Sequence, residues 1–265
     1  MRAAIRITVL LNVLLATGGP GSAGDDAAAG PSPRPREGVA HDDGVRTMRA
    51  LPVNLARGLV GVVHADNLSP AILGGAASAA ASFFDGRVRT AVVEPFKWGD
   101  SFETAGGPVY SSIVVAGMFT AGRIVEAPRF RAMTYDMLDS AVVAFTYTSV
   151  LKVAVGRERP NGQDNKSFPS GHTANAFALA AVAQHHYGWK IGVPAYALAG
   201  LMGASRVNQD KHWVSDVFAG ATLGYVAGRT VVRVNGRSPA RGAATWSVSP
   251  LLARNTRGLQ ASVVF

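Results

Sequence analysis

No cysteine occurs among the 265 residues of the chain. This absence excludes disulfide bonds, thiolate zinc sites, iron–sulfur clusters and cysteine nucleophiles. Charged residues are also few, at 16%, and hydrophobic residues make up 48%, which excludes disordered, collagen-like and coiled-coil proteins. Aromatic residues amount to only 8%, whereas glycine alone contributes 30 residues, so we expect closely packed backbones rather than a core of bulky side chains.

Long, strongly apolar runs are scarce as well. Runs free of Asp, Glu, Lys and Arg within the apolar segments include Asn67–Phe84, Thr173–Trp189 and Ile191–Ser205, which are 18, 17 and 15 residues long. All three are rich in alanine or glycine and contain polar residues, whereas a membrane-spanning helix usually reads as about 20 strongly apolar residues. Asp139 and Asp216 also fall within apolar segments. The sequence therefore favours a densely packed soluble bundle over a polytopic membrane protein.

The chain carries a formal net charge of +9. Such an excess suits nucleic acid, an anionic membrane or an anionic substrate. Trp189, Trp213 and Trp246 are scattered and form no aromatic–basic platform, so no nucleic-acid partner is expected. Arginines near the C-terminus suit contact with anionic lipid headgroups, or equally a solvated basic end. These are Arg229, Arg233, Arg237 and Arg241.

The first 23 residues have the pattern of a secretory signal peptide. Arg2 and Arg6 precede an apolar run at 7–16, and small residues follow as far as Ala23. That run is shorter than the roughly 17 residues that span a bilayer, although an uncleaved N-terminal anchor remains the alternative. We therefore expect an exported protein of the periplasm or envelope. Residues 24–45 combine Pro, Gly, Ala and charge without an apolar period, which predicts a disordered linker.

Apolar segments with helical character fill the middle of the chain. Their approximate ranges are 69–84, 108–125, 132–157, 172–187, 191–206 and 212–233. Strand signals are missing between them, so the sequence predicts an all-α bundle of about six core helices in a domain at 46–236. The tail at 237–265 differs, because apolar and polar residues alternate on both sides of a polar segment, which predicts a short C-terminal β-hairpin.

Basic side chains gather at the end of one predicted helix. Lys152 and Arg159 lie seven residues apart and are followed by Pro160. Seven residues return to nearly the same face of a helix, so both cations are expected to point at one place. The proline then ends the helix.

A second motif, Pro169-Ser170-Gly171-His172, stands directly before another apolar helix. Ser170 is expected at the N-cap, and Gly171 allows a close approach of the backbone to a ligand. Free N–H groups and the positive end of the helix dipole make such a helix start an anion site. His172 would lie beside this anion as a proton carrier.

The third motif begins at Ser205-Arg206 and continues through His212 to Asp216. His212 and Asp216 are four residues apart, so on a helix the carboxylate can hold one ring nitrogen and leave the other free. Each motif alone is usually structural: a solvated face, a capped helix start or a structural His–Asp pair. Together they specify eleven residue identities in a fixed order, and that combination is a strong signal.

These residues resemble the type 2 phosphatidic acid phosphatases, which share a superfamily with bacterial non-specific acid phosphatases and vanadium haloperoxidases. The family signature appears here as KVAVGRERP at 152–160, PSGH at 169–172 and SRVNQDKHWVSD at 205–216. The resemblance covers about 69–233 and implies an all-α core. The connector between the first two motifs, 161–168, is only eight residues long.

The resemblance also implies a way of holding the substrate. Lys152, Arg159 and Arg206 would bind the phosphate oxygens. The side chain of Ser170 and the backbone amide of Gly171 would assist them. This agrees with the cations and helix-start amides found from the residues themselves.

For catalysis the resemblance implies three roles. His212 would attack phosphorus and form a phosphohistidine. His172 would protonate the leaving oxygen and then activate water, while Asp216 would orient His212 and stabilise its cationic form. Covalent catalysis of this kind divides a displacement into two steps.

The sequence therefore predicts a phosphatase that acts without metal or other cofactor on phosphomonoesters or lipid (pyro)phosphates. The alternative is a vanadate-dependent haloperoxidase, whose vanadate would be tethered to His212 in the same pocket. A non-catalytic anion-binding protein is the third possibility, although it would be expected to lack His172 or His212. His185 and His186 point about 100° apart on a helix and have no ligand spacing, so no metal site is expected there. The leaving group and the oligomeric state stay open.

Overall fold

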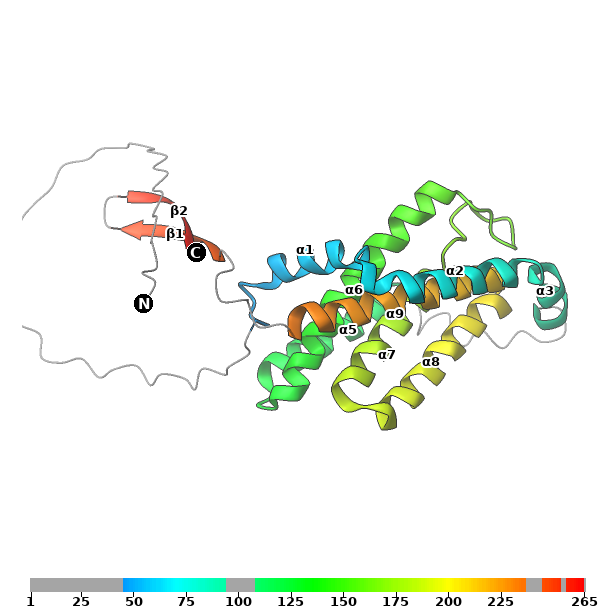
Figure 1. Ribbon diagram of the computed structural model, residues 1–265, viewed down its shortest axis with the longest axis horizontal. Coiled ribbons are helices and arrows are strands. Elements are labelled where there is room, and N and C mark those ends of the chain that lie inside the picture. The colour runs from blue at the N-terminus through cyan, green and yellow to red at the C-terminus, as the bar shows by residue number, and fades with distance from the viewer. Residues whose placement is uncertain (1–44, 94–107, 237–244, 254–255, 265) are drawn as a thin grey trace, which may run out of the picture. The chain divides into compact units, whose positions relative to one another are not determined.

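The computed structural model describes residues 45–93, 108–236, 245–253 and 256–264 (Figure 1). The predicted signal peptide and nearly all of the predicted linker lie outside these ranges. The first described elements are α1 (Leu51–Val62), the 3-10 turn η1 (Ala65–Asn67), α2 (Leu68–Ser82) and α3 (Asp85–Val93). The others of the domain are α5 (Pro108–Ile124), α6 (Pro128–Val155), α7 (Gly171–Tyr187), α8 (Trp189–Asn208) and α9 (Val214–Gly236).

The helix ends follow from proline and glycine. α6 begins at Pro128, where a missing N–H costs nothing, after Ala127 in an extended conformation. Its C-cap residue is Gly156, whose φ of 58° is left-handed and therefore favours glycine. Gly188, with a φ of 75°, separates α7 from α8. The prediction of an all-α domain is confirmed, and α1 and α3 add to the six helices expected.

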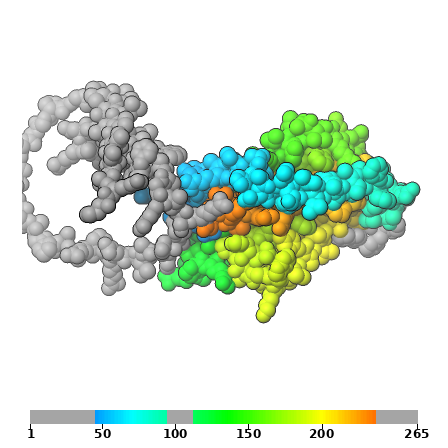
Figure 2. Space-filling model, viewed as in Figure 1, coloured from blue at the N-terminus to red at the C-terminus, as the bar shows by residue number. Residues whose placement is uncertain are grey.

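The centre of the bundle consists of small residues. α7 packs against α6, α8 and α9, while α1 and α2 lie along α9 on the face seen in Figure 2. One core cluster consists of the fully buried residues Val143, Ala144, Ala174, Ala178, Ala227 and Val231. Because these side chains are short, the helix backbones approach each other closely, as the composition predicted.

The contact between α7 and α9 shows this most clearly. A Cβ atom on Gly220, Gly224 or Gly228 would lie 2.4, 2.0 or 2.6 Å from a backbone carbonyl oxygen of α7 or of its N-cap residue. Only glycine therefore fits at these three positions. The contact holds the start of α7 against α9, and these two segments carry the second and third sequence motifs.

We expect Gly224→Ala to destabilise the domain, because its Cβ would lie 2.0 Å from the carbonyl oxygen of Ala174. Overpacking of this kind costs about 1–3 kcal/mol. The midpoint of thermal unfolding in detergent should fall by several degrees. Gly200→Ala in α8 is the matched control, since nothing lies within 4 Å of its added Cβ. Equal midpoints for the two variants would contradict the close contact.

Large apolar side chains remain exposed on the outside of the bundle. They include Ile72 and Leu73 on α2, Val150 and Val153 on α6 and Leu198 on α8. Within the described ranges, α6 is the one helix that is long and apolar enough to cross a membrane. Contiguous exposed apolar surface usually marks a site of contact with lipid or protein.

The tail forms a unit separate from the helical domain. Its strands β1 (Thr245–Ala253) and β2 (Thr256–Val264) pair antiparallel, from Thr245 opposite Val264 to Ala253 opposite Thr256.

Candidate active site

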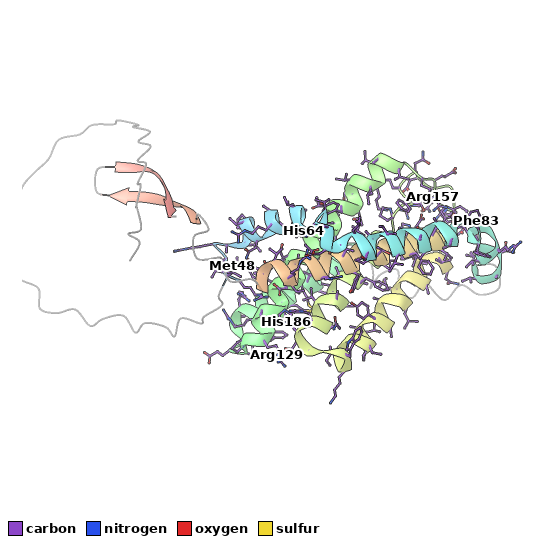
Figure 3. All side chains as sticks on the ribbon, viewed as in Figure 1. Met48, His64, Phe83, Arg129, Arg157 and His186 are labelled. Atoms are coloured by element: carbon purple, nitrogen blue, oxygen red, sulfur yellow. The ribbon has the colours of Figure 1, made fainter. Side chains whose placement is uncertain are left out.

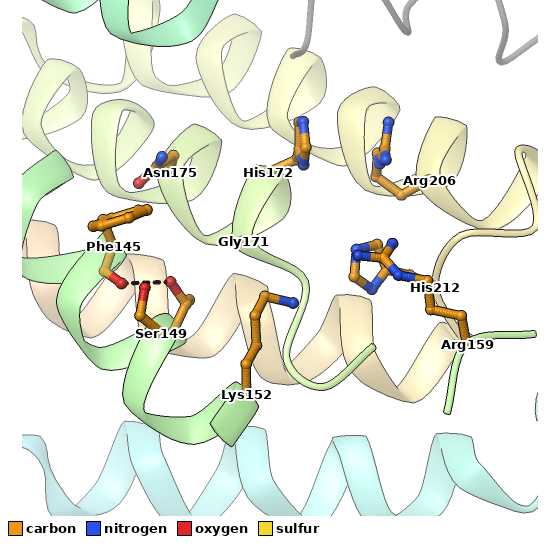
Figure 4. Close-up of a pocket in the computed structure, with 10 residues that line it drawn as sticks. Phe145, Ser149, Lys152, Arg159, Gly171, His172, Asn175, Arg206 and His212 are labelled. Atoms are coloured by element: carbon orange, nitrogen blue, oxygen red, sulfur yellow. Dashed lines mark hydrogen bonds between the residues drawn. The ribbon is translucent and has the colours of Figure 1, made fainter. Parts of the chain in front are cut away.

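Residues from all three sequence motifs line one pocket of about 210 Å³ (Figure 4). Six of the eight predicted site residues line this pocket, whereas Ser170 and Asp216 are buried and do not line it. The lining residues are Phe145, Thr148, Ser149, Lys152, Arg159, Gly171, His172, Asn175, Arg206 and His212. The three cations come from the end of α6, the following loop and the end of α8. This lining contains no carboxylate, so its charge favours an anion.

Each cation is held by a neighbouring oxygen. Lys152 donates to the carbonyl oxygen of Lys166. Arg159 donates from Nε to Asp164 Oδ1 at 2.7 Å and from Nη1 to the carbonyl oxygen of Lys211 at 3.1 Å. Arg206 donates from Nη1 to the side chain of Gln209 and is only 4% exposed.

Arg159 reaches the pocket by a different route from the one expected. α6 ends at Val155, and the left-handed Gly156 turns the chain into a loop before Arg159. Lys152 and Arg159 therefore do not share a helix face, and that part of the prediction is wrong. The hydrogen bonds of Arg159 to Asp164 and Lys211 bring its guanidinium back to the pocket instead.

Several buried polar atoms at the pocket have no hydrogen-bond partner among the described residues. They are Nε2 of His172, Nδ1 of His212, Nε of Arg206 and Oδ1 of Asn175. Buried polar atoms in folded proteins are nearly always paired. Nδ1 of His212 lies toward Asp216, whereas the unpaired atoms of His172, Asn175 and Arg206 belong to residues of the pocket lining. Together with the three cations, they indicate a site built for a polar, negatively charged ligand.

His212 lies in the loop between α8 and α9 and is 2% exposed. The spacing in the sequence predicted that His212 and Asp216 lie on one helix. α9 begins only at Val214, so the two residues do not share a helix, and that part of the prediction is wrong. They still meet, with 3.7 Å between His212 Nδ1 and Asp216 Oδ2. This distance is longer than a hydrogen bond, so Asp216 acts on the ring mainly through its charge.

The surroundings of His212 keep its ring neutral. Burial lowers the pKa of His212 to about 4, against the opposing effect of the Asp216 carboxylate. Lys152 and Arg159 lower this pKa further by charge repulsion. The imidazole is therefore unprotonated near neutral pH, as a nucleophile must be.

Asp216 is fully buried behind His212 and is bound by donors that the sequence analysis missed. Its Oδ1 accepts from Arg157 Nη1 at 2.7 Å. Its Oδ2 accepts from the Ser167 hydroxyl and from the backbone N–H of Trp213. No local pattern distinguishes Arg157 or Ser167 from an ordinary loop residue, because the partner lies about 50 residues away in the sequence.

Ser170 and Gly171 mark the start of α7. Ser170 is the N-cap residue, as predicted, but its hydroxyl makes no capping bond and instead accepts from Thr173 Oγ1 at 2.9 Å. Its N–H donates to the carbonyl oxygen of Asp216 at 3.0 Å, so the second and third motifs are joined directly. Gly171, and not the Ser170 side chain, reaches the pocket.

The histidine pair at the end of α7 lies elsewhere in the bundle. His186 Nε2 is 2.8 Å from Asp136 Oδ2, and the two histidine rings contact each other edge to face. Within the described ranges, no group of three or more His, Asp or Glu side chains gathers as a metal site.

Residues 135–239 match the model of the PAP2 superfamily. They form a PAP2 superfamily domain. All eight predicted site residues fall within this domain, so the resemblance inferred from the motifs is confirmed. The motifs predicted a resemblance over about 69–233, whereas the match begins at residue 135. α1, α2, α3 and α5 therefore lie outside it.

Two curated relatives share short stretches with this chain. An 80-residue stretch is 42% identical to the lipid A 1-phosphatase of Porphyromonas gingivalis and covers 29% of this chain and 18% of that protein. A 68-residue stretch is 35% identical to the lipid A 4'-phosphatase of Helicobacter pylori and covers 26% of this chain and 34% of that protein. The chain thus spans about a third or less of either relative.

Two solved structures superimpose on part of this chain. The crystal structure of Aquifex aeolicus LpxE superimposes with a TM-score of 0.49 at 20% identity, over 57% of this chain and 95% of that one. A transmembrane PAP2-type phosphatidylglycerolphosphate phosphatase from Bacillus subtilis superimposes with a TM-score of 0.48 at 20% identity, over 71% of this chain and 94% of that one.

The preference for a soluble protein is wrong. The curated relatives of the PAP2 domain are lipid A phosphatases, and α6 is long and apolar enough to cross a membrane. Val153 on that helix is 83% exposed, and other large apolar side chains around the bundle are exposed as well. Exposed apolar surface of this extent is costly in water and is matched by lipid.

Proposed function

We propose that the PAP2 domain hydrolyses the phosphate ester or pyrophosphate of a membrane lipid through a phosphohistidine on His212. The observation that carries this proposal is the convergence of three cations and two histidines on one pocket without a carboxylate. Lys152, Arg159 and Arg206 supply the positive charge. Phosphoryl transfer needs mainly such positioning and charge stabilisation.

The phosphoryl group would sit between the cations and the start of α7. Its non-bridging oxygens accept from Lys152, Arg159 and Arg206. The backbone at Gly171 adds the positive end of the α7 dipole, which favours an anion at that place. Arg206 Nε, which has no partner among the described residues, gains one in this arrangement.

In the first chemical step, His212 Nε2 attacks phosphorus, because Nδ1 faces Asp216. The P–N bond forms as the bond from phosphorus to the ester oxygen breaks. His172 donates its proton to the departing oxygen, so the alcohol leaves neutral. Asp216 stabilises the positive charge that develops on the His212 ring.

In the second step, water attacks phosphorus and His172, now neutral, accepts the proton of the water. The P–N bond breaks, inorganic phosphate forms and His212 returns to the neutral ring. The same histidine thus serves as acid and then as base, and the proton it gains in the second step restores the starting state.

The size of the pocket supports a lipid as the substrate. At about 210 Å³ it is smaller than the roughly 300–1,000 Å³ that enclose a drug-sized ligand. It therefore takes the phosphoryl group and the first atoms of the leaving group, while the rest lies outside. Phe145, at the lining and 62% exposed, offers apolar surface to that outer part.

We expect Phe145→Ala to raise KM for a lipid phosphate in mixed micelles about five- to tenfold, since it removes part of the roughly 1.5–3 kcal/mol that a buried Phe contributes. KM for p-nitrophenyl phosphate should not change, because that substrate lacks a chain. Val150→Ala is the matched control, as Val150 is equally exposed on α6 but does not line the pocket. Equal effects on both substrates would argue against a lipid leaving group.

Vanadate inhibition tests the phosphatase assignment as a whole. We expect vanadate to compete with p-nitrophenyl phosphate at a Ki at least about tenfold below that of phosphate, because a site built for the transferring phosphoryl group prefers a bipyramidal oxyanion. EDTA should leave hydrolysis unchanged, since Lys152, Arg159 and Arg206 provide the positive charge. Equal Ki values would count against the proposal, and vanadate-dependent bromide oxidation would favour a haloperoxidase instead.

A further inference from the structure

Arg157 is a charged residue that neither lines the pocket nor belongs to the family signature. It lies in the loop after α6, and its guanidinium connects two carboxylates from distant parts of the chain. Nη1 donates to Asp216 Oδ1 at 2.7 Å, and Nη2 donates to Asp85 Oδ2 at 2.8 Å. Figure 3 shows Arg157 at the same end of the bundle as Phe83, the residue that caps α2 shortly before Asp85.

Asp85 is the first residue of α3 and is 6% exposed. Besides Arg157 it binds Ser215, the neighbour of Asp216. The Ser215 N–H donates to Asp85 Oδ1 at 2.9 Å, and the Ser215 hydroxyl donates to Oδ2 at 2.6 Å. Arg157 also donates to the Ser215 hydroxyl at 2.7 Å. Asp85, Arg157 and Ser215 therefore form a closed group, and within it Arg157 is the residue that donates to Asp216 Oδ1.

α3 also holds the other side of the loop that carries His212. Arg89 makes two hydrogen bonds of 2.7 Å to the carboxylate of Asp210. Asp210 has a φ of 59°, a left-handed conformation that a residue with a side chain adopts at a cost. The Asn208 side chain donates to the carbonyl oxygen of Val92 at 2.9 Å. α3 is thus bonded to the chain on both sides of His212, to Asn208 and Asp210 before it and to Ser215, in α9, after it.

We propose that Arg157 is a positioning residue for the His212–Asp216 pair and that Asp85 on α3 holds Arg157 in place. This inference rests on the proposed function, because it assumes that His212 is the nucleophile. One end of the guanidinium binds Asp85 and the other holds Asp216 Oδ1, while Oδ2 of the same carboxylate faces His212 Nδ1. α3 lies outside the matched PAP2 segment, so a helix beyond that segment orients its nucleophile.

The arrangement predicts which kinetic step depends on Arg157. Arg157 is absent from the pocket lining, so phosphate binding should not need it. Without it, Asp216 Oδ1 loses its ionic partner, and only the Ser167 hydroxyl and the Trp213 N–H, both on Oδ2, still orient the carboxylate. The positive charge that develops on the ring during attack is then less well stabilised. We therefore expect slower formation of the phosphohistidine with unchanged affinity for phosphate.

Arg157→Lys is the variant of choice, because removing the charge would leave two buried carboxylates, Asp85 and Asp216, without an ionic partner and destabilise the domain. An ammonium group keeps the charge but cannot reach both carboxylates in the fork geometry of arginine. In single-turnover experiments on the full chain in detergent, with p-nitrophenyl phosphate, we expect phosphohistidine formation to slow about 10- to 100-fold, as for partners that orient metal ligands. The Ki of inorganic phosphate should stay within about twofold.

A double-mutant cycle separates positioning from a general loss of stability. In the Asp216→Asn background, Arg157→Lys should slow the same step by less than about twofold, because the carboxylate it orients is gone. Asp85→Asn alone should slow the step in the same direction, although Asp85 touches neither Asp216 nor the pocket. Full multiplication of the Arg157 and Asp216 effects, or an unchanged rate in Arg157→Lys, would overturn the inference.

The outcomes also distinguish this inference from the proposed function. If the wild-type protein traps no phosphate on His212, the proposed mechanism fails and the role of Arg157 fails with it. If the wild-type protein traps phosphate and Arg157→Lys does so at the same rate, only the inference fails. If Arg157→Lys unfolds, the Ki of phosphate is lost too, and Asp85→Asn then decides, with a wild-type rate as the result that overturns the proposal.

Discussion

His212→Ala should trap no labelled phosphate and should retain less than about 1% of wild-type turnover. The variant lacks the nitrogen that forms the P–N bond, and the other histidine of the pocket lining, His172, serves in proton transfer in the proposed mechanism. When catalytic residues act as a unit, removal of the nucleophile typically lowers kcat by several powers of ten. The measurement is incubation with a phosphorus-labelled lipid substrate, followed by alkaline quenching and detection of label on the protein.

The fold should survive this substitution, for a reason visible in the structure. When the His212 ring is removed, Asp216 keeps its bonds to Arg157, Ser167 and the N–H of Trp213. No buried charge is left unpaired, so the thermal unfolding midpoint should change little beyond the effect of a small cavity.

His186→Ala is the matched control for His212→Ala. It removes another largely buried histidine near a carboxylate, and its partner Asp136 keeps Arg46 and Asn235. This variant should retain near wild-type turnover and trapping. Label still trapped on His212→Ala would move the nucleophile to another residue.

Six of the residues that line the pocket could be predicted from the sequence, because they belong to three short motifs. Each motif adjoins a helix end, so the chain topology brings them to one end of the bundle. The geometry within the motifs was less predictable. The left-handed Gly156 ends α6 before Arg159, and α9 begins after His212 rather than before it. Helical spacing therefore pointed to residues that do meet at one pocket, although they do not share the helices that this spacing implied.

Arg157 and Asp85 could not have been predicted, because 72 residues separate them. Each one taken alone reads as a solvated charge in a loop or at a helix start. Their role arises only when α3 packs beside the loop before α9, and no local period or motif encodes that contact. The same holds for Arg89 and Asp210, which are 121 residues apart.

The error about the membrane has a related cause. Asp139 and Asp216 counted against spanning helices, because isolated charges are costly in lipid. In the structure both carboxylates are buried inside the bundle and bound, Asp139 to Asn235 and Asp216 to Arg157. The apolar side chains face outward instead, as Val150 and Val153 do on α6. A sequence average cannot separate charges that face inward from charges that face lipid.

His172→Ala should slow the first step far more for an alkyl or lipid phosphate than for p-nitrophenyl phosphate. A general acid of this kind contributes about 10²–10⁴ in rate when the leaving group needs its proton. An alkoxide leaves poorly without that proton, whereas nitrophenolate leaves readily. We therefore expect a loss of about 10²–10⁴ for the alkyl ester and a loss at least about tenfold smaller for the nitrophenyl ester.

The comparison requires single-turnover conditions. His172 should also activate water in the second step, so steady-state turnover would fall for both substrates and hide the difference. His172→Gln is the informative companion variant, because an amide can hydrogen-bond to the phosphoryl group but cannot transfer a proton. If His172 is the acid, Gln and Ala should show the same dependence on the leaving group.

Equal losses for the two esters would show that His172 is not the acid. In that case recovery by His172→Gln would assign the ring to phosphate binding, beside Gly171 at the start of α7. Burial and the neighbouring cations lower the pKa of His172 to about 3, so the acid role requires the bound phosphoryl anion to raise it again. The buried Nε2 of His172, at the same pocket as His212 and without a partner among the described residues, is placed to accept that proton and pass it on. A group that only bound phosphate would add a fourth contact to oxygens already facing three cations. A proton donor to the ester oxygen is the one part of the reaction that Lys152, Arg159, Arg206 and His212 leave unfilled.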